Sequence, residues 1–445
     1  MIQSELLMRL TDYRHYPSGA IDTHLHPHIP QSLQRRIVDR RLRKVIRKAY
    51  QDVPFYRDTF DQAGVNPAHF QGIKDISSLP FLNKSDVQEH YPKNLVARGI
   101  NLDRCEHSAT TGSSGIATNF IFTPKTYAYY HTTSLKVYTM IGYRPWHKAT
   151  YIKYTAVPAP NLGPIFRVNH IPSMIPVEQH ISALREQKPD LLVGYASLIL
   201  DIARSVTDKD LKVIKPRFIS VNSELSTQEQ RDEISKTFNC PVYDEYSSEE
   251  TWMIASQCRE LNYHLFTNNV WVEFVDSAGN EVATGELGEI VLTTLQSPAM
   301  PFIRYRIGDL GRAGTEPCAC GSSLPVLASF EGRADDAFVL ANGDRVPSLK
   351  LLNAFTTFIK ADADYIREFK LVQTGLSEAV IRLVPGPNYA GEQTDELVKR
   401  LQSIIPQPIE FSIDITDQLD TGSVKQKAIE SLVYKKAQEG ANTDA

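Results

Sequence analysis

Residues 108–118 combine glycines with small hydroxylated side chains, in the order Ser-Ala-Thr-Thr-Gly-Ser-Ser-Gly-Ile-Ala-Thr. Gly112 and Gly115 allow the backbone to adopt positive φ and to approach a ligand closely. Successive N–H groups in such a loop form a concave anion site, and the hydroxyls add donors. We interpret this run as a polyphosphate-binding loop, with a flexible polar loop as the alternative. It lacks the Lys-Ser/Thr ending of a Walker loop, which excludes that motif.

Five further segments follow this loop in a fixed order. They read Tyr-Asp-Glu-Tyr-Ser-Ser-Glu-Glu at 243–250, Gly-Glu-Leu-Gly-Glu at 285–289, Arg-Tyr-Arg-Ile-Gly-Asp at 304–309, Glu-Gly-Arg-Ala-Asp-Asp at 331–336 and Thr-Gly-Ser-Val-Lys at 421–425. Three shorter phrases accompany them: Val-Pro-Phe-Tyr-Arg at 53–57, Leu-Pro-Phe-Leu-Asn-Lys at 79–84 and Cys-Ala-Cys-Gly at 318–321. From about residue 35 onward, this order resembles the motifs of the adenylate-forming superfamily. The resemblance is greatest to the phenylacetate–coenzyme A ligase family and its capsule-biosynthesis (CapK) and coenzyme F390 synthetase-like relatives.

The resemblance implies both a fold and a reaction. The fold is α/β, with a large N-terminal adenylation domain of mixed and parallel sheets (1–334) and a small mobile α+β C-terminal domain (335–445). The reaction activates a carboxylic acid with ATP as acyl-AMP, releases pyrophosphate and transfers the acyl group. Coenzyme A is the leading acceptor and an aromatic acid the leading substrate.

The resemblance also assigns roles to individual residues. The loop is expected to bind the β- and γ-phosphates of ATP. The residues that would do so are Thr110, Thr111, Gly112, Ser113, Ser114 and Gly115. Glu250 takes the place of a Mg²⁺ ligand near the α-phosphate, which suits a carboxylate because hard cations prefer oxygen ligands. Tyr246 takes the place of the ring that stacks on adenine. The same segment adds Asp244 and Glu245 to the nucleotide site.

The remaining nucleotide-site assignments lie in three other segments. Asp309 matches the carboxylate that accepts hydrogen bonds from both ribose hydroxyls, and Arg333 the arginine that reaches ribose or phosphate. Glu224 lies where the family lines its adenine pocket. Lys425 matches the catalytic lysine that bridges the substrate carboxylate and the α-phosphate, with Lys427 as the fallback. The resemblance further implies that the small domain rotates about Asp335 between the two half-reactions.

Several readings stay open beside the leading one. The family's Lys-Pro, Gly and Gly are replaced by Ile116-Ala117, Ser247 and Val424, which leaves room for a nucleotide-binding relative without catalysis. An amide- or ester-forming adenylase would use an amine, an amino acid or a carrier as acceptor. Four aromatic residues are candidates for an aromatic-acid site, with core packing as an equal explanation: Tyr143, Tyr154, Tyr195 and Trp252.

Two groups of residues have metal-ligand chemistry. Cys318 and Cys320 lie two residues apart, and Cys258 and His264 lie about sixty residues upstream. Together they fit a structural, non-catalytic zinc site with three Cys and one His, with reduced thiols as the alternative. Cys105 and Cys240 show no such partners, so we expect them in the core.

The second group is Asp-Thr-His-Leu-His at 22–26, which resembles the opening of metal-dependent amidohydrolases. The rest of the chain lacks the expected lysine and histidine series. We therefore expect a loop at His24, His26 and His28, with adventitious metal binding next and a hydrolase last.

Composition excludes several classes of function. The 445 residues carry 48 Lys plus Arg against 52 Asp plus Glu, so the chain lacks the basic balance typical of nucleic-acid binding. No apolar stretch reaches the roughly 18 residues of a membrane span, and no secretory signal is visible. Five cysteines do not make a disulfide framework. We expect a cytoplasmic protein whose partners are small molecules, with a homodimer left open.

The hydrophobic pattern alternates short apolar runs with helical stretches, which favours α/β architecture. We expect strands at 149–152, 191–193, 218–221 and 290–292, helices at 177–186, 199–207 and 226–238, and a hairpin over 270–282. After a domain boundary near Asp335, strands at 337–340, 368–373, 379–384 and 409–413 alternate with helices at 349–359 and 395–404. Residues 32–50 show helical spacing with eight Arg or Lys residues, which we interpret as a solvated basic face rather than a site for an acidic partner or a membrane.

Overall fold

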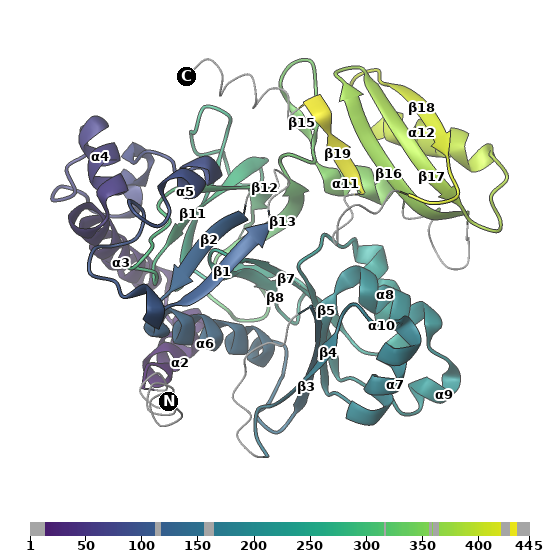
Figure 1. Ribbon diagram of the computed structural model, residues 1–445, viewed down its shortest axis with the longest axis horizontal. Helices are drawn as coiled ribbons and strands as arrows, with labels where there is room; N and C mark the ends of the chain where they lie inside the picture. The colour runs from purple at the N-terminus through teal and green to yellow at the C-terminus, as the bar shows by residue number, and fades with distance from the viewer. Residues whose placement is uncertain are drawn as a thin grey trace.

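The computed structural model describes residues 14–111, 117–154, 164–315, 317–355, 358, 365–419 and 428–433. The amino-terminal part is helical, and its helices cover one side of the large domain (Figure 1). They are α2 (Tyr16–Leu25), η1 (His26–His28), α3 (Gln31–Asp52), α4 (Pro54–Gln62), η2 (Ile73–Ser78), α5 (Lys84–His90) and η3 (Leu102–Arg104). No helix among the described residues is both long and apolar enough to cross a bilayer.

The large domain is organised around one eleven-stranded sheet, in the order β10-β11-β12-β13-β9-β8-β7-β6-β5-β3-β4. Its first half is parallel and is made of β3 (Lys148–Lys153), β4 (Arg167–Pro172), β5 (Leu191–Tyr195), β6 (Phe218–Asn222) and β7 (Val242–Ser248). Helices accompany these strands as crossovers: α7 (Val177–Gln187), α8 (Ala196–Ser205), α9 (Asp208–Leu211) and α10 (Gln228–Phe238). Helices cover both faces of a parallel sheet, so its central strands carry apolar side chains on both faces. β5 is an example, because most of its residues are buried.

The second half of the sheet is antiparallel. It contains β8 (Trp252–Gln257), β9 (Tyr263–Leu265), β10 (Val270–Val275), β11 (Gly288–Thr294), β12 (Tyr305–Ala313) and β13 (Val326–Arg333). A separate hairpin of β1 (Glu106–Thr111) and β2 (Ala117–Phe122) precedes α6 (Pro124–Met140). The mixed α/β class predicted from the sequence is confirmed, because parallel crossovers and antiparallel meanders share this sheet.

The carboxy-terminal part forms its own layer of sheet and helices (Figure 1). It comprises β14 (Phe338–Val339), β15 (Arg345–Val346), α11 (Ser348–Phe355), β16 (Ile366–Gly375), β17 (Glu378–Pro385), α12 (Glu392–Ile404), β18 (Glu410–Ile415) and β19 (Ile429–Ser431). Its apolar core begins at Phe338 and is distinct from the clusters of the large domain. This separation supports the proposed boundary near Asp335.

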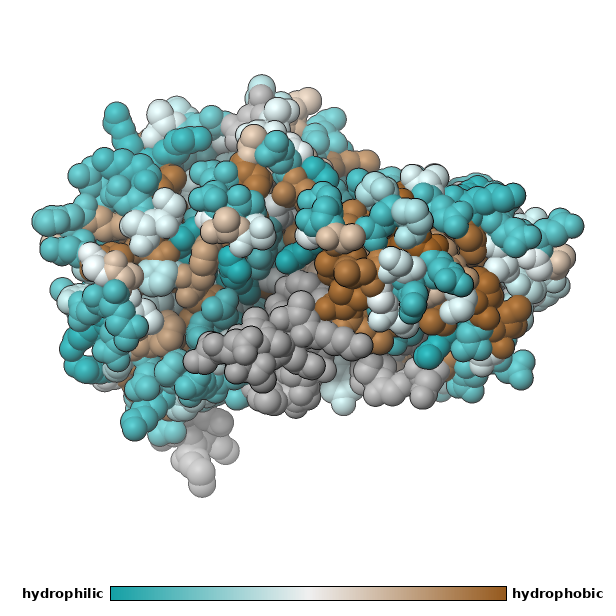
Figure 2. Space-filling model, turned by 90° about the horizontal axis from the view of Figure 1, so that it is seen from above, coloured by the Kyte–Doolittle hydropathy of each residue, from teal (hydrophilic) through white to brown (hydrophobic). Residues whose placement is uncertain are grey.

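Figure 2 shows apolar surface on the side of the molecule where the carboxy-terminal sheet lies. In this part of the chain, Leu376, Ile413 and Ile415 are exposed, and β18 is an edge strand.

Most of the expected elements are present, and two expectations were wrong. The segment 280–282 makes no full strand: the hairpin is closed by a single bridge between Val275 and Glu281, while β10 pairs along its length with β11. Residues 21–28 are helical in α2 and η1 rather than a loop, since Pro27 lies in the first turn of η1, where its missing N–H costs nothing.

A buried arginine ties the amino-terminal segment to the sheet. Arg304 is 2% exposed, and its guanidinium lies 3.1 Å from the Glu273 carboxylate. It also donates to the carbonyl oxygens of Ser77 (3.0 Å) and Leu79 (2.8 Å) and covers the ring of Phe81. Burial raises the pKa of Glu273, and the guanidinium opposes that rise.

We expect Arg304→Met to lower the free energy of unfolding by about 3–5 kcal/mol, because it leaves the Glu273 carboxylate buried without its cation. Urea denaturation followed by circular dichroism measures the change. The double variant Arg304→Met/Glu273→Met is the control, and it should recover part of the loss because no buried charge remains. A double variant as unstable as the sum of the single variants would contradict this account.

Candidate functional site

The pairing of β12 with β13 brings two candidate residues together from separate motifs. Asp309 and Arg333 are direct partners in this antiparallel register. Arg333 Nη1 lies 3.4 Å from Asp309 Oδ1, and Arg333 Nε lies 3.2 Å from Asp335 Oδ1. The sheet register therefore forms a cluster of one cation and two carboxylates at the start of the segment that leads into the small domain.

Tyr246 joins this cluster from β7. Its hydroxyl donates to Asp309 Oδ2 at 2.7 Å, and its ring packs against Phe330 with the centroids 4.5 Å apart. Both Tyr246 and Asp309 are buried. Burial raises the pKa of Asp309 to about 6, while Arg333 and the Tyr246 hydroxyl favour its charged form. Oδ2 of this buried carboxylate accepts a hydrogen bond from Tyr246, while Oδ1 has the charge of Arg333 nearby but no hydrogen-bond partner among the described groups.

Glu250 lies beside the same cluster. It is buried just after β7, and the Tyr305 hydroxyl donates to its Oε1 at 3.1 Å. The charge of Glu250 also contributes to raising the pKa of Asp309. The Glu250 carboxylate is a suitable oxygen ligand for a hard divalent cation. Sequence reasoning missed Tyr305, although it lies inside the 304–309 motif.

The predicted phosphate loop is flanked by the hairpin of β1 and β2. Gly112, Ser113, Ser114 and Gly115 lie outside the described residues, and Thr111 is described only in its backbone. The neighbouring Thr110 has a buried Oγ1 with no hydrogen-bond partner among the described groups. Ser108 Oγ donates to Glu249 Oε2 at 2.9 Å, which joins the hairpin to the acidic segment.

Asp244 and Glu245 have partners other than the Asp309 cluster. Asp244 lies 3.5 Å from Arg231 and accepts a hydrogen bond from the Tyr263 hydroxyl at 2.5 Å. Burial raises the pKa of Asp244 to about 6. Neighbouring residues of a strand point to opposite faces of the sheet, so Glu245 has other partners than Asp244. Its carboxylate accepts hydrogen bonds from Ser220 and from Asn222 Nδ2.

The carboxyl ends of three parallel strands meet near Glu245. Lys153 ends β3, Tyr195 ends β5 and Asn222 ends β6. Lys153 Nζ contacts Asn222 Oδ1 and Ser223 Oγ and lies 4.4 Å from the centre of the Tyr195 ring. Ligands of open α/β sheets bind at this edge. The sequence analysis did not single out Lys153. Its position directly after the predicted strand 149–152 could have indicated that it lies at the ligand-binding edge of the sheet.

Glu224 is engaged at a helix start. Its carboxylate accepts from the backbone N–H of Ser197 (3.1 Å) and from Ser197 Oγ (2.7 Å), in the first turn of α8. A carboxylate is favourable there because the helix N-terminus carries partial positive charge. The contact gives Glu224 a structural role beside the predicted one in the adenine pocket.

The four aromatic candidates are not gathered in one place. Tyr143 packs in the core with Tyr138 and His147. Trp252 packs with a separate group of rings, namely Phe122, Tyr127, Tyr130 and His131. Tyr195 contacts Lys153, and Tyr154 is 65% exposed. Of the four, only Trp252 is close in sequence to Glu250.

The predicted zinc ligands converge from the residue that follows β8, from β9 and from the loop before β13. One ligand atom from each of Cys258, His264, Cys318 and Cys320 lies within 4.8 Å of the others. Cys258 Sγ and Cys318 Sγ are 3.7 Å apart, and Cys320 Sγ is 3.2 Å from His264 Nε2. Tetrahedral zinc geometry separates such ligand pairs by about 3.5–3.8 Å. All five cysteines are free thiols.

Outer contacts orient these ligands. His264 Nδ1 lies 3.2 Å from the Leu324 carbonyl oxygen, which directs Nε2 toward the cysteines. Asn262 Nδ2 donates to Cys318 Sγ at 3.3 Å. His24, His26 and His28 belong to no such group among the described residues; His26 Nε2 instead contacts Thr267 Oγ1 at 3.1 Å. Lys425 and Lys427 lie outside the described residues.

We expect Tyr246→Phe to raise the pKa of Asp309 above its value of about 6, because the hydroxyl stabilises the carboxylate. Arg333→Gln should raise it further, since a charge is removed. Carboxyl ¹³C NMR over a pH series measures both. Tyr263→Phe is the matched control, because its hydroxyl serves Asp244 instead. An Asp309 pKa that responds equally to Tyr246→Phe and Tyr263→Phe would refute this assignment of the network.

The chain is similar in sequence to several known proteins. No family model matches the chain. A phenylacetate–coenzyme A ligase from Thermus thermophilus is 25% identical over 340 residues, 72% of this chain and 75% of that protein. Protein CapK from Staphylococcus aureus is 23% identical over 336 residues, 70% of each chain.

A solved structure shares the fold over nearly the whole length. The 2-hydroxyisobutyryl-CoA ligase in complex with 2-HIB-AMP superposes with a TM-score of 0.77 at 19% identity, covering 95% of this chain and 94% of that one. The order of the motifs and these relatives agree: the chain is similar to adenylate-forming enzymes of the group that includes phenylacetate–coenzyme A ligase and CapK, and it shares their fold.

Proposed function

We propose that this protein is an acid–AMP ligase that uses ATP to activate a carboxylic acid and then transfers the acyl group, with coenzyme A as the leading acceptor. The observation that carries the proposal is the buried Asp309 between Arg333 and Tyr246, next to Glu250. Asp309 offers a carboxylate to the ribose hydroxyls of ATP, and Glu250 offers a second carboxylate to a divalent cation. Relatives named as phenylacetate–coenzyme A ligases support the reaction and an aromatic acid as its substrate.

In the first half-reaction, a carboxylate oxygen of the acid attacks the α-phosphorus of ATP. The bond to the bridging oxygen breaks, and pyrophosphate leaves with the electron pair. Two anions must approach each other, so preorganised positive charge and hydrogen-bond donors reduce the barrier. In this proposal, residues 110–115 bind the β- and γ-phosphates. Lys425 places its positive charge between the carboxylate of the acid and the α-phosphate. Mg²⁺ bound at Glu250 would neutralise phosphate charge.

In the second half-reaction, the acceptor attacks the acyl carbonyl carbon and AMP leaves. We propose that the domain 335–445 rotates about Asp335, which carries Lys425 away and admits the acceptor. Asp335 lies two residues after the end of β13 and contacts Arg333 in the state described here. Gly332 supports a tight connection, because a Cβ there would lie 2.2 Å from Ser348 Oγ at the start of α11. Asp335→Pro fixes φ and should impair one half-reaction more than the other.

We also propose a structural zinc ion at Cys258, His264, Cys318 and Cys320. The ligand separations and the His264–Leu324 contact suit tetrahedral zinc. A site closed by four protein ligands has no open position for substrate. Its zinc would join β8, β9 and the segment before β13, which supports the register that places Arg333 opposite Asp309.

We expect Lys425→Ala to reduce acid-dependent ATP–pyrophosphate exchange by about 100-fold or more, the scale of a lost preorganised charge. Transfer from supplied acyl-AMP should be largely retained, because the α-phosphate is no longer attacked. Lys427→Ala is the matched control and should retain exchange. The assay uses a panel of aromatic and aliphatic acids, followed by mass analysis of products with coenzyme A and with amines.

The outcomes separate the alternatives. Absence of exchange with every acid in the wild-type protein would contradict the proposed ligase and favour a nucleotide-binding relative. Exchange followed only by amide products would exclude coenzyme A as acceptor. Equal loss in both half-reactions for Lys425→Ala would indicate damage to the fold instead of a lost catalytic charge.

We expect one zinc per chain by elemental analysis of protein purified without a metal-affinity tag. Cys318→Ser/Cys320→Ser should lose the metal and lower the melting temperature, because metal binding is coupled to folding. The control Cys240→Ser changes a cysteine outside the cluster and should keep the metal. Tag-free protein that holds no zinc and exposes all five thiols to rapid reaction would disprove the site.

A further inference from the structure

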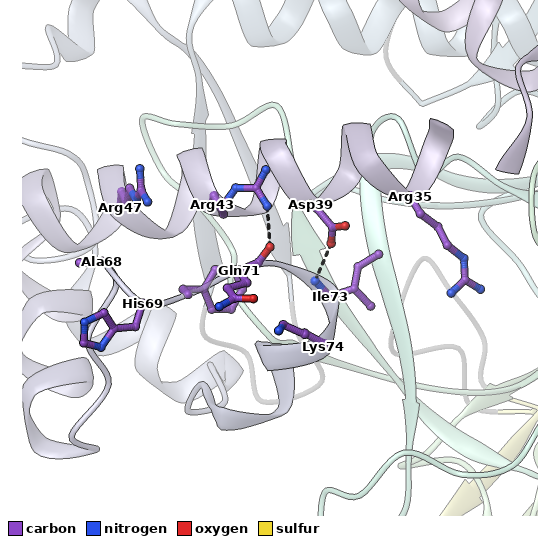
Figure 3. Close-up of a pocket in the computed structure, with 10 residues that line it drawn as sticks. Arg35, Asp39, Arg43, Arg47, Ala68, His69, Gln71, Ile73 and Lys74 are labelled. Atoms are coloured by element: carbon purple, nitrogen blue, oxygen red, sulfur yellow. Dashed lines mark hydrogen bonds between the residues drawn. The ribbon is translucent and has the colours of Figure 1, made fainter. Parts of the chain in front are cut away.

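A groove lies between α3 and the segment 68–74, apart from the residues of the nucleotide site (Figure 3). Its volume is about 790 Å³, within the range of roughly 300–1,000 Å³ typical of small-molecule sites. The side chains that line it are Arg35, Asp39, Arg43, Arg47, Ala68, His69, Phe70, Gln71, Ile73 and Lys74.

One wall of the groove is a stripe along α3. Arg35, Asp39, Arg43 and Arg47 occur at every fourth position, so they lie on one face of the helix. The stripe spans about 18 Å at 1.5 Å per residue. Figure 3 shows Arg35 toward one end of the groove and Arg47 toward the other, with Lys74 across from the helix.

Two contacts fix the shape of the groove. Arg43 Nη1 donates to the Gln71 carbonyl oxygen at 2.6 Å, and Asp39 Oδ1 accepts from the backbone N–H of Ile73 at 2.9 Å. Gly72 has φ +136°, and a Cβ there would lie 2.2 Å from Asp39 Oδ1. The glycine is therefore required for the close approach of segment 68–74 to the helix.

The remaining cations of the groove have no acidic partner in the part of the chain that the structure describes. These are Arg35 and Arg47 on the helix and Lys74 on the opposite wall. Other basic residues of α3 are paired, as Arg41 is with Asp22 (2.7 Å) and Lys48 with Asp52 (2.5 Å). Like charges gathered in a concave site produce a positive field that favours an anion.

We propose that this groove binds an elongated small-molecule polyanion that carries phosphate groups. Guanidinium groups favour phosphate because their planar N–H donors match its oxygens in pairs. The length of the stripe, with cations toward both ends, suits a ligand whose anionic groups are spread along a chain. A solvated helix face explains the charges of Arg36, Arg40 and Lys44, but not the cations that line this groove.

Inorganic tripolyphosphate is the probe, titrated by calorimetry at constant ionic strength. The test variant is Arg35→Gln/Arg47→Gln/Lys74→Gln. The matched control is Arg36→Gln/Arg40→Gln/Lys44→Gln, which removes the same charge from the same helix outside the groove. We expect wild-type protein to show a binding event that weakens by about tenfold or more in the test variant and by less than about threefold in the control.

Other readouts keep the result specific. Any tripolyphosphate bound at residues 110–115 should remain in both variants, and acid-dependent pyrophosphate exchange should be unchanged in both, so this proposal and the ligase proposal fail separately. Circular dichroism verifies folding, and the single variant Lys74→Gln repeats the test if the triple variant does not fold.

Three results would overturn the proposal. Equal weakening in the test and control variants would mean that only the overall charge of α3 matters. Binding of tripolyphosphate no tighter than that of sulfate would mean non-specific screening. Binding of polyglutamate in preference to tripolyphosphate would identify an acidic protein segment as the occupant instead of a phosphorylated small molecule.

Discussion

The site depends on keeping the Asp309 carboxylate buried yet supplied with polar partners. Removing a carboxylate from water is unfavourable, as the rise of its pKa to about 6 reflects. Arg333 and Tyr246 offset that cost from two different strands. Both partners are correctly placed only if β12 pairs with β13 in the observed register and β7 keeps its position in the sheet. A register shift of one residue would turn Asp309 to the other face.

β7 joins the parallel and antiparallel halves of the large sheet. It is parallel to β6 on one side and antiparallel to β8 on the other. Because its residues alternate between faces, Glu245 reaches the strand ends that carry Asn222, while Tyr246 reaches Asp309. One short strand therefore connects the parallel-strand edge, where such folds bind ligands, with the antiparallel motifs.

Positive charge is used in two ways in this chain. Arg304 and Arg231 are buried and tied to carboxylates, and their role is to hold segments together. Arg35, Arg47 and Lys74 line a groove without such partners in the described part of the chain. The chain has a small net negative charge, so this local excess on α3 arises from its placement and not from overall composition.

The sequence alone indicated the resemblance to adenylate-forming enzymes, the α/β class and most elements, because hydrophobic period and motif order are local properties. It also indicated the Cys and His set that converges in the structure. It did not reveal that Tyr305 contacts Glu250, that Lys153 meets Asn222, or that Glu224 caps α8. Nor did it separate the basic helix face into paired and groove-lining cations. These facts depend on which distant segments meet, and strand register and packing decide that only when the whole chain folds.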